Sequence, residues 1–290
     1  MSNTISWTGT LTATSSIAHG GETRGTITLL RRELVALPDG RLVHLPIISG
    51  NSLRGRLRRI GEELLRDVLC YEGQLSPAAA HALRGGGSLA KTAGEPLSGN
   101  RLQTLRNLVP QVGVFGAAGG GCIIDGALDV GKVVPHVIET NHITGSASHR
   151  SAFAATQIES YTRQDDTDAH DFTTVIPTTA LSFDESGLPE VDAHGGSQQM
   201  LYRIETFPAG TVFSTWLRLR RATDLEAAFF KDIMKAFTAD GRLGGRIGIG
   251  HGQVRVNLKG TTASPPAKVD WRAITLEHRA QILTALESLA

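Results

Sequence analysis

Two stretches of the chain alternate apolar or small residues with polar ones, which predicts strands. Residues 5–14 read ISWTGTLTAT, in which every second position from Ile5 is apolar or small. Residues 211–219 alternate more loosely after a Pro-Ala-Gly turn. A period of two gives a strand one buried and one exposed face. We predict further β structure at residues 26–45, with a turn at Pro38-Asp39-Gly40, and at residues 253–258.

Other stretches repeat their apolar residues every three or four positions, which predicts helices with one buried face. The first follows residues 49–52, where Ser49 and Ser52 offer N-cap chemistry. The second covers residues 224–237, and a third covers residues 271–289 behind a linker. The first two helices lie between predicted strands along the chain, and the third follows the last predicted strand.

Residues 148–198 interrupt the periodic pattern with acidic residues and Gly/Pro turns around a short β-like run. We predict an inserted hairpin or arm there. Without it, the order is strand, helix, strand, strand, helix, strand. This β-α-β-β-α-β order predicts an α+β fold of the ferredoxin-like or RNA-recognition-motif-like type. The sheet faces of such domains often bind single-stranded RNA by stacking its bases.

Charge is distributed unevenly although the formal net charge is only +1. Residues 1–150 carry 15 Lys and Arg against 11 Asp and Glu, and residues 199–260 carry 10 against 5. Residues 151–198 carry one basic residue against nine acids. Arginine supplies 23 of the 29 basic residues, and its planar guanidinium suits phosphate binding. Two basic blocks favour an anionic partner; an ordinary solvated surface is the alternative.

Several classes of protein are disfavoured. No stretch approaches the roughly 20 apolar residues of a membrane span, and the N-terminus lacks the layout of a signal peptide, so we expect a cytoplasmic protein without a membrane partner. Cys70 and Cys122 are the only cysteines, and we interpret both as buried small residues. The ten histidines include no HxxxH or HExxH pair. We therefore expect neither a metal nor a cofactor.

The start of the first helix is a candidate anion site. The sequence Ser49-Gly50-Asn51-Ser52 leaves backbone amides unpaired at the positive end of the helix dipole, and Arg54 and Arg56 follow within two turns. Cations at this end oppose the dipole unless an anion offsets them. The alternative is a well-capped helix with a solvated basic face.

The second candidate is a glycine-rich loop. Residues 241–252 contain six glycines in twelve positions, between a helix and a strand. Glycine lets backbone amides approach an anion, and Arg246 and His251 add charge or hydrogen bonds. A tight turn packed against a neighbouring element is the alternative. The loop is not a dinucleotide-binding fingerprint, because that motif leads from a strand into a helix.

Four segments together resemble the RAMP superfamily of CRISPR proteins. In particular, they resemble the backbone subunit that coats the guide RNA in multi-subunit effector complexes, most closely that of type IV systems. The segments are IISGNSLRGRLR at residues 47–58, VFG and the following glycines at 114–121, IETNHITGSAS with ETFPAGTVF at 138–148 and 205–213, and LGGRIGIGHGQV at 243–254.

The resemblance implies a ferredoxin-like palm with finger insertions, formed by residues 1–147 and 199–260. It also implies a thumb hairpin at residues 148–198, followed by a C-terminal linker and helix at 261–290. The implied partners are guide RNA (crRNA), a target nucleic acid, further copies of this chain in a helical filament, and other CRISPR effector subunits. The expected RNA-binding residues are His19, Ser49, Gly50, Asn51, Ser52, Arg54, Arg56, Asn141, His142, Arg150, Gly245, Arg246, Ile247, Gly248 and His251.

We expect binding without catalysis. Type III relatives that cut target RNA place an Asp in the loop after the first strand, whereas here Asp39 lies in a Pro-Asp-Gly turn and Glu33 is the other acid near the expected place. The alternative is a type III-like endoribonuclease that cuts the target once per subunit, with Glu33 or Asp39 acting on the target or His19 in guide processing. A metabolic enzyme with a phosphate-binding loop is disfavoured because no paired catalytic residues accompany the loop.

Overall fold

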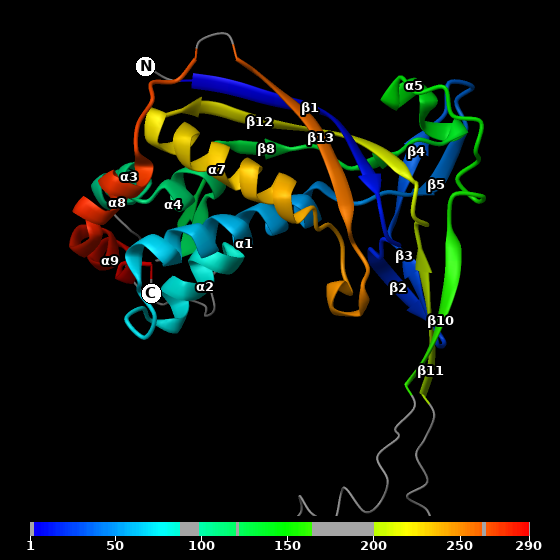
Figure 1. Cartoon of the computed structure of the whole chain (residues 1–290), viewed down its shortest axis with the longest axis horizontal. Coiled ribbons are helices and arrows are strands. Elements are labelled where there is room, and N and C mark those ends of the chain that lie inside the picture. The colour runs from blue at the N-terminus through cyan, green and yellow to red at the C-terminus, as the bar shows by residue number, and fades with distance from the viewer. Residues whose placement is uncertain (1–2, 88–98, 120–121, 164–199, 263–264, 290) are drawn as a thin grey trace, which may run out of the picture.

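The computed structural model describes residues 3–87, 99–119, 122–163, 200–262 and 265–289. Its largest sheet is antiparallel and has the order β13 (Val254–Thr262), β1 (Asn3–Ala13), β12 (Val212–Ala222) and β8 (Leu128–Val130), with β9 (Val134–Pro135) also paired to β12 (Figure 1). The long β1 and β12 are central. Each contains the alternating pattern that predicted a strand.

Helices α1 (Gly50–Leu69) and α7 (Asp224–Asp240) lie along one face of this sheet (Figure 1). The chain order β1-α1-β8-β12-α7-β13 is the ferredoxin-like arrangement, so the predicted α+β fold is confirmed. Helix α7 begins with a capping box, in which Thr223 Oγ1 accepts from the Glu226 amide at 3.2 Å and the Glu226 carboxylate accepts from the Thr223 amide at 2.7 Å.

The main core lies between the sheet and these two helices. Phe213 on β12 and Phe230 on α7 are fully buried in it. The Trp7 ring of β1 meets Phe230 edge to face with centroids 5.1 Å apart, and Phe207 meets Phe213 at 5.0 Å. Because aromatic rings remove large apolar areas from water, this layer holds the sheet and the helices in a fixed relation.

Shorter elements cover the far end of the helical layer. They are α2 (Pro77–Gly85), α3 (Gly99–Leu108), α4 (Pro110–Phe115), α8 (Trp271–Glu277), α9 (Arg279–Glu287) and the β6–β7 pair (Ala117–Gly119, Cys122–Ile124). The single C-terminal helix expected from the sequence is therefore two helices that meet at His278. The Arg279 side chain donates to the carbonyls of Leu69 and Cys70, which fixes the start of α9 against the end of α1.

The interpretation of Cys70 as a buried residue is wrong. Cys70 is exposed, and its backbone is left-handed at φ 46° where α1 ends. Its amide still donates to the Arg66 carbonyl at 2.8 Å. Because helix ends turn out of the core at such a residue, the side chain points away from the apolar layer.

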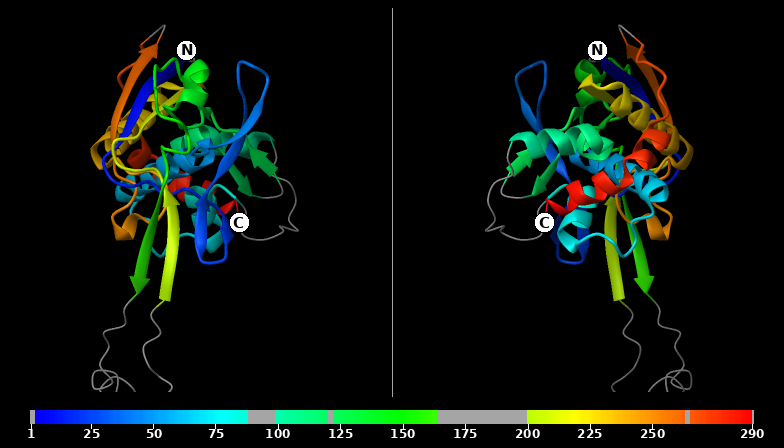
Figure 2. Two further views of the ribbon diagram at one scale, coloured as in Figure 1. Left: turned by 90° about the vertical axis from the view of Figure 1, so that its right-hand side faces the viewer. Right: turned by 90° about the vertical axis from the view of Figure 1, so that its left-hand side faces the viewer.

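A second sheet joins segments distant in sequence, in the order β10 (Gln157–Arg163), β11 (Met200–Thr206), β3 (Ile27–Leu30) and β2 (Gly20–Arg24). Strands β10 and β11 form a hairpin that projects from the body (Figures 1 and 2). The remainder of the expected thumb, residues 164–198, lies outside the described residues. Residues 200–206, which the sequence analysis placed in the palm, pair along the whole of β10.

The β4–β5 hairpin (Arg32–Ala36, Leu42–Pro46) surrounds the predicted turn at residues 38–40. It lies beside the short helices η1 (Ile138–Thr140) and α5 (Asn141–Thr144) (Figure 1). A small apolar cluster underlies this region and is separate from the main core; its buried members are Val35, Leu45, Ile47, Val137, Ala152 and Ala155.

Candidate nucleic-acid interface

The start of α1 is built by a serine cap and a close backbone approach. Ser49 is the N-cap, and its hydroxyl accepts from the Ser52 amide at 3.3 Å. Gly50 is required because a Cβ there would lie 2.7 Å from the Val130 carbonyl oxygen. Asn51 is exposed next to them, and no acidic residue lies in the first turn of the helix. The first turn of α1 therefore contains no carboxylate that could neutralise the positive end of the helix dipole.

The glycine-rich loop contains η3 (Ile247–Ile249) and folds back on itself. Gly244 and Gly252 have φ of +85° and +86°, and a Cβ on either would lie 2.4 Å from a backbone oxygen. Gly248 differs, since a Cβ there would meet open space. The first two glycines are thus required by the fold, while Gly248 leaves the backbone accessible from outside.

Two consecutive residues after β1 connect these segments. The Ala18 carbonyl accepts from the Gly245 amide at 2.8 Å, and His19 Nε2 accepts from the Ser49 amide at 3.2 Å. The start of α1 and the glycine-rich loop therefore lie on either side of one short length of backbone, although about 190 residues separate them in sequence. A single binding track lined by both segments would require this proximity.

The surroundings of His19 favour its neutral form. Burial lowers its pKa, the charge of Arg31 lowers it further, and Glu33 acts in the opposite direction. A neutral imidazole can accept at Nε2 from the Ser49 amide, as the geometry requires. His19 is thus a positioning residue for the helix start.

Arg246 is the basic residue best placed at the loop. It is exposed and adopts a left-handed backbone at φ 57°, which costs a non-glycine residue on the order of 1 kcal/mol. Its guanidinium lies 5.2 Å from the centroid of the Tyr202 ring, and Tyr202 stacks on Tyr161 across the hairpin. The strained backbone places this cation against the β10–β11 hairpin. Ile247 follows it in η3 and is half-buried.

His251 faces inward. Its side chain is 3% exposed, with Nε2 2.5 Å from the Tyr161 hydroxyl and 3.6 Å from a Glu159 oxygen. Tyr161 also donates to Glu159. Burial raises the pKa of Tyr161, and the bond to Glu159 adds to this effect, giving about 12. His251 therefore joins the glycine-rich loop to the hairpin, and it is not an exposed ligand in this structure.

The Arg54 side chain is half-buried, and its guanidinium is hydrogen-bonded within the chain. It donates to the carbonyls of Leu128 and Phe115, and its neighbour Arg58 donates to those of Phe115 at 2.6 Å and Gly116 at 2.9 Å. Burial lowers the pKa of Arg54, and burial together with Arg54 lowers that of Arg58 to about 10. These guanidiniums donate to the free carbonyls at the end of α4. Cations are favourable there because the C-terminus is the negative end of a helix dipole.

Arg56 pairs with Asp240, the last residue of α7, and Asp240 also accepts from Arg242 at 3.1 Å. The Arg56 side chain is 17% exposed. Its charge is therefore compensated within the chain. The pair is a second link between α1 and the glycine-rich loop, which begins at the next residue, Gly241.

Asn141, His142 and Arg150 lie around α5, by the β4–β5 hairpin. The side-chain amide nitrogen of Asn141 donates to the Ser148 carbonyl at 2.8 Å, and its side-chain oxygen accepts from the Ser148 amide at 3.1 Å. His142 Nε2 lies 3.0 Å from the Ala36 carbonyl, and Arg150 Nε donates to the Ala154 carbonyl at 2.8 Å. These bonds shape the loop that carries them, and these residues belong to a region distinct from the start of α1.

A hollow of about 590 Å³ opens beside the start of α1. Besides residues 49–51, its lining contains Arg31, Lys132, Glu33 and Trp216. Arg31 is exposed, and Lys132 pairs with Glu33. Sequence reasoning missed Arg31 and Lys132, because no local motif marks them and only the fold brings them to the helix start.

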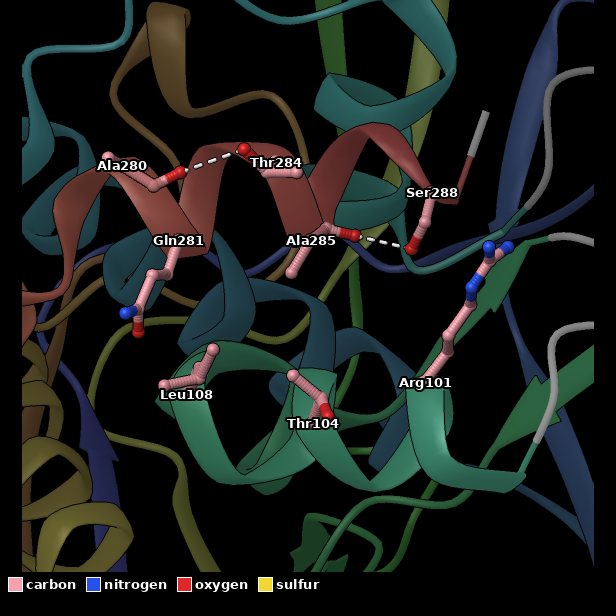
Figure 3. A pocket seen from close by; sticks show the side chains of 8 residues that line it. All are labelled: Arg101, Thr104, Leu108, Ala280, Gln281, Thr284, Ala285 and Ser288. Carbon is pink, nitrogen blue, oxygen red and sulfur yellow. Dashed lines mark hydrogen bonds between the residues drawn. The ribbon is translucent and has the colours of Figure 1, made fainter.

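Another hollow, of about 730 Å³, lies between α3 and α9 (Figure 3). Its hydroxyl groups are engaged locally, since Thr284 donates to the Ala280 carbonyl at 3.0 Å and Ser288 to that of Ala285 at 2.6 Å. It lies in the helical layer and is lined mainly by short side chains. We do not assign it to the interface.

Among the described residues, no group of three His, Cys, Asp or Glu side chains is arranged to hold a metal ion. Within the same residues, no helix combines the length and apolarity needed to cross a bilayer. Asp39 is exposed at the tip of the β4–β5 hairpin and accepts from the Arg41 amide and side chain, which lower its pKa.

Comparisons with known proteins agree with this fold. The family model described as "RAMP superfamily" matches residues 10–255. A chain of the solved structure entitled "Type IV-B CRISPR Complex" is 31% identical, with a TM-score of 0.57, over 92% of this chain and 93% of that chain. No curated protein matches the sequence.

The chain belongs to the RAMP superfamily. The predicted resemblance, including its closeness to type IV systems, is confirmed, and the two matches support a role as a subunit of a CRISPR effector complex.

Proposed function

We propose that this protein is a non-catalytic backbone subunit that binds guide RNA through its phosphates. The observation that carries the proposal is the meeting of the α1 start and the glycine-rich loop on either side of Ala18 and His19. Exposed backbone amides and cations bind any RNA sequence alike, because phosphates carry no sequence information. A subunit that must hold variable guides needs this property.

The proposed contacts differ from those expected from sequence. We retain the amides of Gly50 and Asn51, the Asn51 side chain, Arg246 and the Gly248 backbone, and we add Arg31. The Ser49 amide is left out because it donates to His19. Arg54, Arg56 and His251 are left out because each side chain forms a hydrogen bond with another part of the chain, and the unpaired Arg56 Nε and His251 Nδ1 are buried. Their role is to hold the two halves of the track in register.

We further propose that copies of the chain stack head to tail along the RNA, with other effector subunits at the ends. The charge pattern supports this proposal, since residues 151–198 carry nine acids against one base while the flanking segments are basic. A contact between unlike surfaces of identical chains builds open filaments. Size-exclusion chromatography with light scattering should give particles whose mass grows with RNA length.

The direct test is fluorescence anisotropy with unrelated single-stranded RNAs at several salt concentrations. We expect similar affinities for all sequences and a linear fall of the logarithm of affinity with the logarithm of salt. A chain that stays monomeric and ignores RNA at low salt would refute the proposal, and so would strong selectivity for one sequence.

An endoribonuclease is the second candidate, and Glu33 is the observation that favours it. Its side chain lines the hollow beside α1, 18% exposed and paired with Lys132. Complementary RNA and a divalent cation added to the assembled complex would reveal regular fragments one subunit repeat apart if this function exists. If the target RNA stays intact, this second candidate is refuted and guide-RNA binding remains the proposed function.

A further inference from the structure

The face of the main sheet that lies opposite α1 and α7 carries an exposed aromatic side chain among polar ones. Trp216 projects from this face of central strand β12 and is 45% exposed. Its cross-strand neighbours in the same row are Thr8 on β1 and, beyond it, Lys259 on β13. The small threonine leaves the ring accessible from the side of the sheet.

The indole ring of Trp216 is held in a fixed position. A Cβ on Gly131 would lie 2.5, 2.7 and 2.8 Å from Nε1, Cδ1 and Cε2 of Trp216, and these nearly equal distances place it above the face of the pyrrole ring. The Gly131 amide also donates to the Trp216 carbonyl at 2.8 Å. One face of the indole therefore rests on a glycine that no other residue can replace without moving the ring, and the ring is held before any ligand arrives.

The surroundings of the ring are cationic. On the strands of this face, Arg218, Arg220, Arg255 and Lys259 are exposed, and the acid among the described strand residues there is Asp129, which pairs with Arg220 at 2.6 Å. Four bases against one acid leave an excess of three positive charges. The Arg218 guanidinium lies over the Trp216 ring, 5.9 Å from the ring centroid, as in a cation–π contact. This charge complements a polyanion.

The ring also borders two hollows. One is the hollow beside the start of α1, and the other, of about 790 Å³, lies over the sheet face and reaches Ile143 and Thr144 of α5. Both are lined by Val130, Lys132 and Trp216. An RNA strand bound at the start of α1 could therefore continue past Lys132 to the indole ring of Trp216.

We propose that Trp216 is a stacking platform for one nucleobase of a single-stranded RNA, with Arg218 and Lys259 beside it for the adjacent phosphates. The inference rests on the proposed RNA-binding function and extends it from phosphates to a base. A π-face accepts every base, so the platform adds affinity without selecting a sequence. A nucleobase flanked by phosphates fits the combination of an exposed indole and excess positive charge better than an apolar protein surface does.

The test compares Trp216→Ala and Trp216→Phe with the wild-type chain, using an RNA oligonucleotide and its abasic counterpart. Trp216→Ala should weaken RNA binding by roughly 5- to 150-fold, and Trp216→Phe by much less. The abasic strand should bind the wild type more weakly than RNA does, and this difference should vanish in Trp216→Ala. Leu276→Ala, an exposed apolar residue on α8, is the control and should change nothing.

Intrinsic fluorescence gives an independent readout. The chain has three tryptophans, of which Trp7 packs on Phe230 and Trp271 is buried, so RNA should quench mainly Trp216. Normal RNA affinity in Trp216→Ala would overturn the platform while leaving the phosphate track intact. Normal RNA affinity with lost self-association would assign this face to a protein contact instead. A wild-type chain that binds no RNA would refute both proposals.

Discussion

The Ser49 amide donates a hydrogen bond to Nε2 of His19 across 3.2 Å. This contact ties the first residue before α1 to the backbone that also accepts from Gly245. It requires an unprotonated Nε2, because a protonated ring would set two N–H groups against each other. The geometry of the proposed track is therefore coupled to the protonation state of a single side chain.

Stability should fall as the pH drops through the region where His19 takes up a proton. The folded pKa is lowered by burial and Arg31, so the unfolded chain, with a pKa near 6.5, binds the proton first. The stabilisation is complete above that value and is lost progressively below it. Urea unfolding between pH 8 and 5 measures this slope.

His19→Gln should flatten that slope, whereas His136→Gln should keep the His19 part of it, although burial lowers the pKa of His136 as well. Equal pH profiles for His19→Gln and the wild type would show that His19 does not carry the effect.

A second loss of stability should occur in acid. Burial raises the pKa of Glu159, but hydrogen bonds from Ser16, Tyr161, Thr206 and Gln157 outweigh it and bring the pKa from its ordinary 4.5 to about 2. The carboxylate thus stabilises the fold above pH 4.5, and this contribution disappears towards pH 2. Glu159→Gln should remove this part of an acid titration followed by circular dichroism, while the exposed Glu22→Gln should leave it unchanged.

The Arg246 side chain should contribute to RNA affinity, and its left-handed backbone should lower the stability of the fold. Arg246→Gln should reduce the slope of log affinity against log salt by about 1 for every RNA sequence. Arg246→Gly should lose RNA affinity in the same way, yet gain up to about 1 kcal/mol in unfolding free energy by relieving the left-handed strain.

Arg221 provides the matched control for Arg246. It is also exposed and left-handed, at φ 48°, but lies near the end of β12 beside Thr4. Arg221→Gly should relieve strain to a similar degree without changing RNA affinity. Equal losses of affinity in both glycine variants would indicate diffuse charge attraction and not a contact at Arg246.

Arg58 should prove structural. Its replacement by methionine removes charged hydrogen bonds to the carbonyls of Phe115 and Gly116 and should destabilise the chain by about 2–4 kcal/mol, measured by chemical denaturation. The folded fraction should bind RNA normally. Arg59→Gln, an exposed change on the next residue, should stay within about 0.5 kcal/mol. A stable Arg58→Met chain that fails to bind RNA would contradict the assignment.

The sequence predicted the elements with strong periodicity and the order that defines the fold. Strands β1 and β12, helices α1 and α7, and the Ser49 cap follow from local patterns whose physical cause lies within a few residues. The division of the C-terminal helix at His278 was missed. At this point Arg279 binds the end of α1, a contact between segments about 210 residues apart that no local pattern reveals.

The candidate site was predictable as two segments but not in its details. Arginines in a helix start look alike in sequence, yet Arg54 turns to the end of α4 and Arg56 to Asp240. His251 contacts Tyr161 on β10, and β10 pairs with β11, from which it is separated in the sequence by residues 164–199. Only the tertiary arrangement decides which polar groups are already satisfied, and so which remain for a ligand.

The most direct measurement places a photo-crosslinking amino acid at position 51 or at position 248 and maps the crosslinked nucleotides on a bound RNA. Asn51 is exposed and Gly248 faces open space, so both substitutions fit the fold. The account predicts that both positions crosslink to the same strand at neighbouring nucleotides. Crosslinks from only one position, or from nucleotides far apart, would contradict a single track.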